Sequence, residues 1–502
     1  MDSNNTFSSE TLSDLSHDAQ CPHKICSGSG IESKLPHAFI KRMRTDFETT
    51  AEYERFIACY SDAPIRAMRI NTLKISKERF LDLCPWRTKQ SELLNEGLIL
   101  TENPEHIGTH PYHIAGLFYM QEPSAMSVVE AAEIAPGMRV LDLCAAPGGK
   151  TTQIAAAIGE SGVLVANEYV PARCRILQGN VERLGLSNTV VTNLDTGALA
   201  DFYGSYFDFV AADAPCSGEG MFRKYEVAPE EWSPENVALC AARQKEILEN
   251  AARLTRPGGM LLYSTCTFSM EENEANVDAF LTGHPDFHLI PAAPAVAAVT
   301  ADGIAFPGCR HGAELPLCRR FYPHLCPGEG QFLALFRREE TAGGDRPQKS
   351  AGKGGQKEGA APLTPAETHT VSALIGEFCE NLPPRQPVFL RGMVCLSPGI
   401  ALPPRGVFAA GVTLGELTHG RLVPHHHFYS AFGRRFLRRL ELKDGDERVL
   451  RYLAGEELDC PELAPANGFA AVLYENAPTG GGKAVNGRLK NHYPKGLRRT
   501  GG

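Results

Sequence analysis

Hydrophobic and polar positions follow two different patterns along the chain. Between Leu35 and about Cys84, apolar residues recur at helical spacing in FIKRMRTDF and YERFIACY, and MRINTLKI then alternates as a strand does. From about Gly137 onward, helical stretches separate five short apolar runs, MRVLDLCA, GVLVANE, TVVTNLD, FDFVAADAP and GMLLYSTCT. Repeated alternation of strand and helix predicts an α/β fold with a doubly wound, mainly parallel sheet covered on both faces.

Composition divides the remainder of the chain. Residues 1–33 are rich in Ser, Asp and Asn and predict a disordered tail, and residues 339–363 are rich in Gly and Lys and predict a flexible linker. Between them we expect a small α+β domain at 34–105 and the α/β domain at 106–338. The C-terminal region, 364–502, contains one amphipathic helix and several strands between Gly and Pro turns, which indicates a small β-rich module.

Charge and cysteine content narrow the class of protein. The formal net charge is -9, yet the chain from Arg405 to its end holds 15 Lys and Arg against 10 Asp and Glu, whereas residues 1–361 hold 33 against 46. A basic C-terminus suits either RNA binding or solubility. Fifteen scattered cysteines indicate reduced thiols. With no apolar run long enough to cross a membrane and no signal peptide, we expect a cytoplasmic monomer.

The first long strand leads directly into a loop of small residues. VLDLC continues as AAPGGKTTQIAAAI, so backbone can approach a ligand at the positive end of the following helix. The pattern fits a nucleotide-type cradle but neither a Walker A loop nor a GxGxxG turn. Glu168, 18 residues after Lys150, suits ribose hydroxyls, and Asp195 suits an adenine amino group. Each acid is equally consistent with a helix cap or a solvated charge.

Two cysteines follow the fourth and fifth strands of this series. The fourth ends as Asp213-Ala-Pro-Cys216-Ser-Gly-Glu-Gly and the fifth as Tyr-Ser-Thr-Cys266-Thr-Phe. Parallel strands present their carboxyl ends at one edge, where ligands of such sheets bind. A single cysteine is usually a small buried hydrophobe. Two of them at neighbouring strand ends indicate thiol chemistry.

The segments DLCAAPGGKT, DAPCSGEGMF and YSTCTFSMEENE, in this order, resemble the Nol/Nop/Sun family of RNA cytosine-5 methyltransferases. Within it the chain is most similar to bacterial RsmF-type 16S rRNA enzymes. The resemblance covers about Leu35 to Phe336 and, more loosely, the C-terminal LKNHYPKGLR. It implies a class I methyltransferase fold, S-adenosyl-L-methionine as cofactor, RNA, with 16S rRNA or the small ribosomal subunit foremost, as partner, and a PUA-like module at about 405–502.

The resemblance also implies roles for individual residues. Cys266 would be the nucleophile, and Cys216 would assist product release. A carboxylic acid beside the ring can help by engaging nitrogen 3 of the base, and Asp213 is the natural candidate. Carbon 5 of cytosine is too weak a nucleophile to accept a methyl group until a thiolate has added to carbon 6. Spacing does not decide which thiol attacks, because DNA cytosine methyltransferases carry the nucleophile in a Pro-Cys dipeptide. The implied cofactor residues are Cys144, Ala145, Ala146, Pro147, Gly148, Gly149, Lys150, Glu168, Asp195 and Asp213.

Several neighbouring residues have an open role. Lys150 is consistent with a contact to the cofactor, a contact to the active-site carboxylate, or a solvated helix start. Phe222 and the cations Arg223 and Lys224 suit RNA binding, although an aromatic here is equally consistent with the core. The tail GRLKNHYPKGLRR interleaves cations with His492 and Tyr493, as backbone contact and base stacking require.

Two groups of cysteine and histidine invite a metal interpretation. Cys309, Cys318 and Cys326 are nine and eight positions apart and lack a CxxC knuckle. The run of three histidines at 425–427 is more typical of a surface turn. We therefore expect no metal site.

Three alternative functions stay open on the sequence. The catalytic motifs indicate which reaction is catalysed but not which RNA is the substrate, so transfer RNA is a second possible substrate. A non-catalytic RNA-binding assembly factor is disfavoured by the intact set of Asp213, Cys216 and Cys266. A small-molecule methyltransferase would have no use for RNA-like appendages at both ends.

Overall fold

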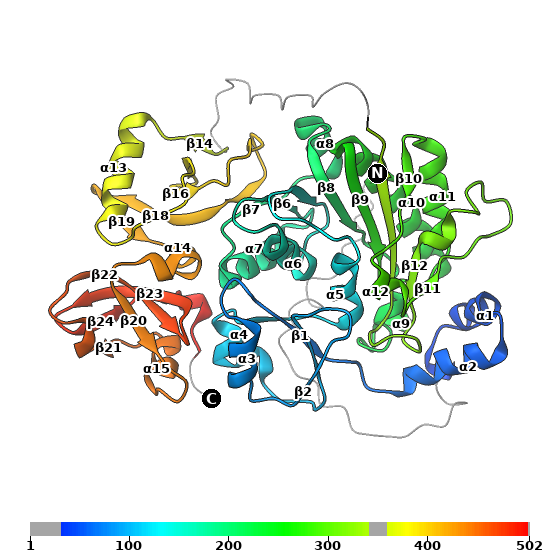
Figure 1. The fold of residues 1–502 in the computed structure, drawn as a ribbon, viewed down its shortest axis with the longest axis horizontal. Coiled ribbons are helices and arrows are strands. Elements are labelled where there is room, and N and C mark those ends of the chain that lie inside the picture. The colour runs from blue at the N-terminus through cyan, green and yellow to red at the C-terminus, as the bar shows by residue number, and fades with distance from the viewer. Residues whose placement is uncertain (1–31, 341–358, 500–502) are drawn as a thin grey trace.

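The computed structural model describes residues 32–340 and 359–499 (Figure 1). The predicted disordered tail, apart from its last two residues, and residues 341–358 of the predicted linker lie outside the described residues. Within the described ranges, no helix is long and apolar enough to cross a membrane.

The N-terminal part combines two helices with a small antiparallel sheet in the order β2-β3-β1-β4. Its sheet takes its last strand from residues beyond 105, the boundary predicted from sequence. The elements are α1 (His37–Asp46), α2 (Thr50–Ala58), β1 (Ala67–Ile70), α3 (Lys77–Leu83), β2 (Thr88–Gln90), β3 (Gly97–Leu100), α4 (Pro111–Ile114) and β4 (Phe118–Met120).

The doubly wound sheet predicted from the alternating pattern is confirmed. Its core runs β7-β6-β5-β8-β9 in parallel, and β13 continues it in the antiparallel sense. The strands are β5 (Arg139–Asp142), β6 (Val163–Asn167), β7 (Thr189–Thr192), β8 (Phe207–Asp213), β9 (Thr255–Thr265), β10 (Phe287–Leu289), β11 (Ala301–Asp302), β12 (Arg319–Phe321) and β13 (Gln331–Arg338). The helices are α5 (Pro123–Glu130), α6 (Gly149–Ile158), α7 (Pro171–Leu184), α8 (Thr196–Tyr203), α9 (Ala228–Glu231), α10 (Pro234–Leu254), α11 (Glu274–Gly283) and α12 (Pro294–Ala297).

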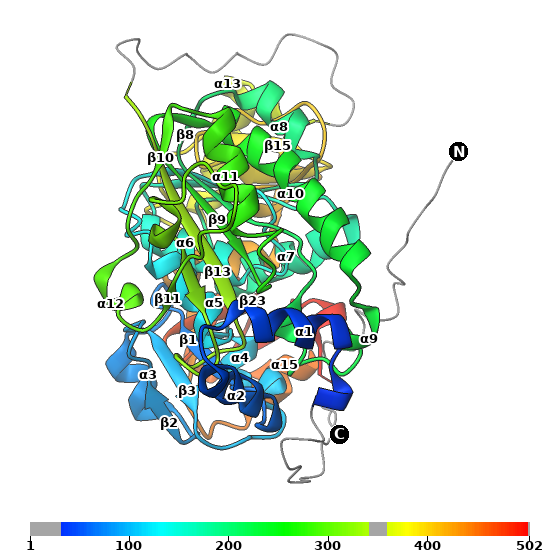
Figure 2. The same ribbon diagram turned by 90° about the vertical axis from the view of Figure 1, so that its right-hand side faces the viewer.

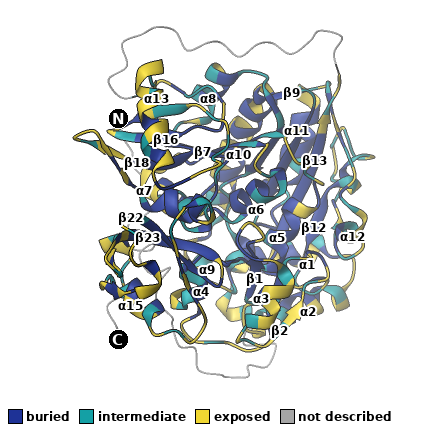
Figure 3. Ribbon diagram, turned by 60° about the vertical axis from the view of Figure 1, so that its left-hand side comes forward, coloured by how far each residue is buried: buried dark blue, intermediate teal, exposed yellow. Residues whose placement is uncertain are grey.

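Helices cover both faces of this sheet. Apolar side chains of α8, α10 and α11 share one buried cluster with the sheet, and those of α5, α6 and α7 share another. Figure 3 shows the buried strands at the centre, with exposed residues on peripheral helices such as α13 and α15. Because both faces are covered, the strands consist of nearly continuous apolar runs.

The C-terminal region holds two further five-stranded sheets. One strand of this region, β17, instead pairs antiparallel with β7 and so extends the central sheet. The elements are β14 (Ala361–Pro362), α13 (Pro365–Gly376), β15 (Pro387–Leu390), β16 (Met393–Leu396), β17 (Val407–Ala410), β18 (Val412–Thr418), β19 (Arg421–Pro424), α14 (His426–Phe432), β20 (Arg439–Leu442), α15 (Arg448–Ala454), β21 (Leu458–Asp459), β22 (Gly468–Tyr474), β23 (Ala477–Val485) and β24 (Arg488–Asn491).

A buried lysine joins the three parts of the chain. The ammonium of Lys74 donates to the carbonyls of Ala115 at 2.8 Å, Arg183 at 2.8 Å and Pro478 at 2.7 Å. The last sheet also shares a hydrophobic cluster with the N-terminal sheet. In Figure 1 it accordingly lies beside α3 and α4. The N- and C-terminal parts therefore pack on each other as well as on the central sheet.

The three histidines at 425–427 do not form a surface turn. They begin α14, and His426 and His427 are buried. A hydrogen bond of 3.0 Å joins His427 Nε2 to the Leu186 carbonyl, and burial lowers the pKa of His427 to about 3. The helix packs between α7 and β23, which local sequence does not reveal.

Candidate active site at the strand ends

The Gly-rich loop after β5 forms a cradle whose carbonyl oxygens are turned away into hydrogen bonds. Arg173 donates to the Ala146 carbonyl at 2.8 Å, and Asn180 donates to the Pro147 carbonyl at 2.9 Å. Gly148 has φ 116°, and a Cβ there would lie 3.3 Å from the Leu177 side chain. The loop thus requires glycine at this position and presents the start of α6 at the strand-end edge.

Two carboxylates follow the next strands along the same edge. The buried Glu168 accepts from the Val170 N–H at 2.8 Å. Asp195 is the N-cap of α8, and one of its oxygens accepts from the Ala198 N–H at 2.8 Å. Its second oxygen has no hydrogen-bond partner among the described residues. The helix-cap role considered from sequence is therefore real for Asp195, and it leaves one acceptor over.

These two carboxylates fit the adenosyl group that the resemblance implies. Ribose hydroxyls and an adenine amino group are hydrogen-bond donors, and the cradle offers Glu168 and Asp195 as acceptors at the ends of β6 and β7. The remaining loop residues, from Cys144 to Gly149, have small side chains except at Pro147 and leave backbone accessible. The residues present therefore suit S-adenosyl-L-methionine.

The Asp213 carboxylate links the cradle to the two cysteines. The Lys150 ammonium donates to Asp213 Oδ2 at 2.8 Å, and the Ser264 hydroxyl donates to Oδ1 at 2.7 Å. Burial opposes the charge on Lys150, but the Asp213 carboxylate outweighs it, so the pKa of Lys150 lies above its ordinary value. Of the three roles considered for Lys150, the structure shows the contact with the active-site carboxylate.

The two thiols lie against each other. The sulfurs of Cys216 and Cys266 are 3.1 Å apart, and the Cys266 N–H donates to Cys216 Sγ at 3.2 Å. The hydrogen bond with Cys266, followed by burial, raises the pKa of Cys216 well above its usual value. The end of β8 and the end of β9 thus present one pair of thiols.

Sequence reasoning missed two buried carboxylates behind the thiols. Glu219 accepts from Arg42 at 2.5 Å, from the Trp232 indole at 2.9 Å and from the Phe268 N–H at 3.0 Å. Glu272 lies under the Cys216 loop and is also fully buried. Its only signal in the sequence was the acidic run EENE, which is ordinarily read as a solvated turn.

The N-terminal helices cover these loops (Figure 2). Phe39 of α1 and Phe56 of α2 share an aromatic cluster with Phe222, Trp232 and Phe268. Phe222 is therefore core rather than an RNA-stacking residue. Side-chain contacts from the chain's N-terminal part thus fix the shape of both cysteine loops.

The cations and aromatics proposed for RNA contact are divided by the structure. Arg223 is paired with the buried Glu329 at 2.6 Å, whereas Lys224 is exposed. In the tail, Tyr493 is buried against Tyr452, and His492 is half-buried. The exposed positive charge of the tail comes from Arg488, Lys490, Lys495 and Arg499.

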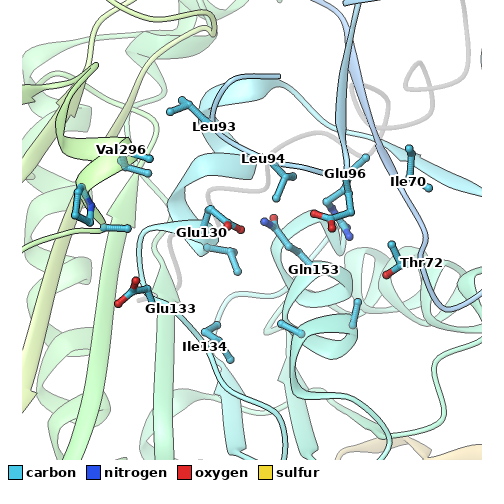
Figure 4. Close-up of a pocket in the computed structure, with 17 residues that line it drawn as sticks. Ile70, Thr72, Leu93, Leu94, Glu96, Glu130, Glu133, Ile134, Gln153 and Val296 are labelled. Atoms are coloured by element: carbon cyan, nitrogen blue, oxygen red, sulfur yellow. The ribbon is translucent and has the colours of Figure 1, made fainter. Parts of the chain in front are cut away.

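A cavity of about 600 Å³ lies away from this edge (Figure 4). It opens between β1, α5 and α6 and is lined by Glu96, Glu130, Glu133 and Gln153 among apolar residues. None of the residues predicted for cofactor binding or catalysis lines it. In the part of the chain described, no group of three His, Cys, Asp or Glu side chains is arranged to hold a metal ion.

Comparison with known proteins finds family models that match three parts of the chain. Residues 130–337 match the family model of the 16S rRNA methyltransferase RsmB/F. Residues 35–123 match the N-terminal domain of 16S rRNA methyltransferase RsmF, and residues 439–499 match the methyltransferase RsmF PUA domain.

Curated and solved relatives agree with these models. Ribosomal RNA small subunit methyltransferase F of Klebsiella pneumoniae (strain 342) is 33% identical over 487 residues, covering 93% of this chain and 97% of the relative. The enzyme of the same name from Escherichia coli (strain SE11) is 32% identical over 490 residues, with the same coverage of both chains. A methyltransferase homolog protein from Pyrococcus horikoshii is 28% identical, with a TM-score of 0.54, over 62% of this chain and 100% of that one.

Proposed function

Because the chain belongs to the RsmF family of S-adenosyl-L-methionine-dependent 16S rRNA methyltransferases, we propose that it methylates carbon 5 of a cytosine in small-subunit rRNA through a covalent Cys266 adduct. The observation that carries the proposal is the pair of thiols 3.1 Å apart beside the Lys150–Asp213 ion pair. A cytoplasmic location is part of this proposal, because the ribosomal RNA of a bacterial cell is found there.

The cofactor would be held by Cys144 to Lys150, Glu168, Asp195 and Asp213. When bound, S-adenosyl-L-methionine supplies an electrophilic methyl group. The cradle would present it near the end of β8, because α6 begins with Gly149 and Lys150, and Lys150 contacts Asp213 at that strand end.

Cys266 acts on carbon 6 of the cytosine. Its thiolate forms a sulfur–carbon bond, and the electron pair of the carbon 5–carbon 6 double bond moves toward carbon 5, which becomes nucleophilic. Asp213, oriented by Lys150 and Ser264, engages nitrogen 3 and stabilises the charge that develops on the ring. The raised pKa of Cys216 supports Cys266 as the attacking thiol, since the neutral Cys216 thiol is the poorer nucleophile.

Cys216 acts when the adduct breaks down. Once Cys266 is bonded to carbon 6, it no longer shares a proton with Cys216, and the main cause of the raised Cys216 pKa disappears. Cys216, once it has released its own proton to solvent, can then accept the proton from carbon 5 as a thiolate. The double bond re-forms, and the Cys266 sulfur leaves as thiolate.

The experiment is transfer of labelled methyl to 16S rRNA, to small ribosomal subunits and to transfer RNA. We expect label in 16S rRNA, a loss of about 10³-fold or more in Cys266→Ala, and an RNA–protein adduct stable to denaturation in Cys216→Ala. Cys84→Ala, a half-buried cysteine of the N-terminal part, is the matched control. Label that persists in Cys266→Ala would refute the assigned nucleophile, and label confined to transfer RNA would refute the assigned substrate.

A further inference from the structure

Cys216 is bracketed by two buried polar side chains that also bind each other. On its N-terminal side, Gln244 of α10 donates to the Pro215 carbonyl at 2.9 Å. On its C-terminal side, Glu272 accepts from the Ser217 N–H at 3.0 Å and from the Ser217 hydroxyl at 2.5 Å. The Gln244 amide closes the bracket by donating to Glu272 at 2.8 Å.

The bracket is rigidly supported and connects the two cysteine loops. Gln244 and Glu272 are both 0% exposed. Tyr263 of β9 and Asn276 of α11 donate to the Gln244 amide oxygen at 3.1 Å and 3.0 Å. The Ser217 hydroxyl lies 2.9 Å from the hydroxyl of Thr267, which directly follows Cys266.

Glu272 is unusual because no cation balances it. Among the described residues no Lys, Arg or His lies within ion-pair distance, so its charge is stabilised by hydrogen bonds alone. A carboxyl group buried in this way accepts hydrogen bonds at both of its oxygens only while it is ionised. The titratable groups that face it are Cys216, Glu219, Cys240 and Tyr263.

We propose that Glu272 is a positioning residue for product release, holding Cys216 at the adduct through Ser217. The inference rests on the proposed function, because it assigns Glu272 to the step in which Cys216 removes the carbon 5 proton. A sulfur 3.1 Å from Cys266 Sγ lies next to the carbon adjacent to the one that Cys266 has bonded. Small rotations of the Cys216 loop would remove it from that position.

The proposal predicts a pH dependence with a definite sign. Burial raises the pKa of Glu272 to about 7. Above that pH the carboxylate accepts all three hydrogen bonds, and below it the added proton displaces one donor. Release of the adduct should therefore slow as pH falls through about 7, while cofactor binding stays constant.

The test is Glu272→Gln, which keeps the shape but adds an N–H₂ where three donors already point. We expect adduct release to slow by about 10- to 100-fold, the adduct to accumulate, and the pH step near 7 to vanish. Single-turnover methyl transfer and the Kd for S-adenosyl-L-methionine should change by less than about threefold. Glu271→Gln, the exposed neighbour in the same motif, is the matched control and should behave as wild type.

A second variant covers the case in which Glu272→Gln fails to fold. Ser217→Ala leaves the carboxylate in place but removes one of its contacts to the loop, and it should slow release in the same direction by about tenfold. The proposal is overturned if folded Glu272→Gln or Ser217→Ala releases product at the wild-type rate. It is also overturned if methyl transfer and release fall equally, which is the mark of a merely structural role. A lack of any adduct in Cys216→Ala would instead refute the underlying reaction.

Discussion

The two halves of the strand-end edge differ in the side chains that hold their loops, although Gln244 also donates to the Pro215 carbonyl in the second half. In the cofactor half, the loop from Cys144 to Lys150, basic and amide side chains such as Arg173 and Asn180 bind backbone carbonyls. In the reaction half, the loops that follow β8 and β9, the carboxylates of Glu219 and Glu272 bind backbone N–H groups. The first half is thus held largely through its carbonyls, although the Ala145 N–H donates to the Asn167 carbonyl at 2.8 Å, and the second is held largely through its N–H groups.

This difference explains why Lys150 matters at the reaction half. Loop N–H groups that are already bound to carboxylates contribute little positive potential near the thiols. Within the hydrogen bonds described for Asp213, Lys150 is the only cation, and it belongs to α6 of the cofactor half. The two halves are therefore coupled through one ion pair.

Removing the Lys150 ammonium should have the largest effect on activity of the changes considered. In Lys150→Met, Asp213 loses its ion pair and its orientation, so we expect methyl transfer to fall by about 100-fold. The Kd for S-adenosyl-L-methionine should rise by a smaller factor, less than about tenfold, because Lys150 is one of several cofactor residues and the cradle carbonyls keep their partners. Isothermal titration and single-turnover kinetics measure the two quantities. Lys245→Met, an exposed lysine on α10, is the control, and a variant that loses affinity but not rate would reverse the assignment.

A smaller effect is expected from Gly148→Ala in the cofactor half. A φ of 116° strains any residue with a Cβ, at a cost on the order of 1–3 kcal/mol. We expect the Kd for S-adenosyl-L-methionine to rise by about tenfold, with kcat at saturating cofactor close to wild type. Gly159→Ala, at the other end of α6 with φ 65°, has open space for its Cβ and should lower stability without changing the Kd. An unchanged Kd in Gly148→Ala would contradict the cradle.

The last prediction concerns folding stability rather than activity, at Asp142, a fully buried carboxyl at the end of β5. Burial raises its pKa to about 7, above the ordinary unfolded value of about 3.9. The folded state therefore binds a proton that the unfolded state lacks, and stability should fall as pH rises from about 4 to 7, by at most about 1.4 kcal/mol per pH unit. Denaturant titrations at pH 5, 6 and 7 should show that Asp142→Asn reduces this slope. The exposed Asp201→Asn should keep it, and equal slopes in wild type and Asp142→Asn would disprove the account.

Local sequence was sufficient for the features that depend on neighbouring residues. The parallel sheet followed from apolar runs between helices, and the cradle followed from small residues directly after a strand. The convergence of Cys216 and Cys266 followed from the rule that parallel strands share one edge for their carboxyl ends.

Long-range packing determined what sequence could not provide. Glu272 and Gln244 are 28 positions apart, and Arg42 and Glu219 are 177 apart, so no local pattern reveals that they bind. The same holds for Phe222, which becomes core only because α1 and α2 fold over it. Buried charge behind a reactive loop is invisible in a motif that otherwise resembles a solvated turn.

The strand β17 has a consequence for the integrity of the central sheet. The backbone from Val407 to Ala410 pairs with the edge of β7 that faces away from β6. Next to this pairing, Asn193 donates its N–H to the Gly406 carbonyl at 2.7 Å. An uncovered parallel edge is a template for pairing with another molecule. A chain shortened before residue 405 would keep every residue of the reaction yet expose that edge. By pairing with β7, the C-terminal region therefore covers a sheet edge that would otherwise be available for strand pairing, independently of any contact with RNA.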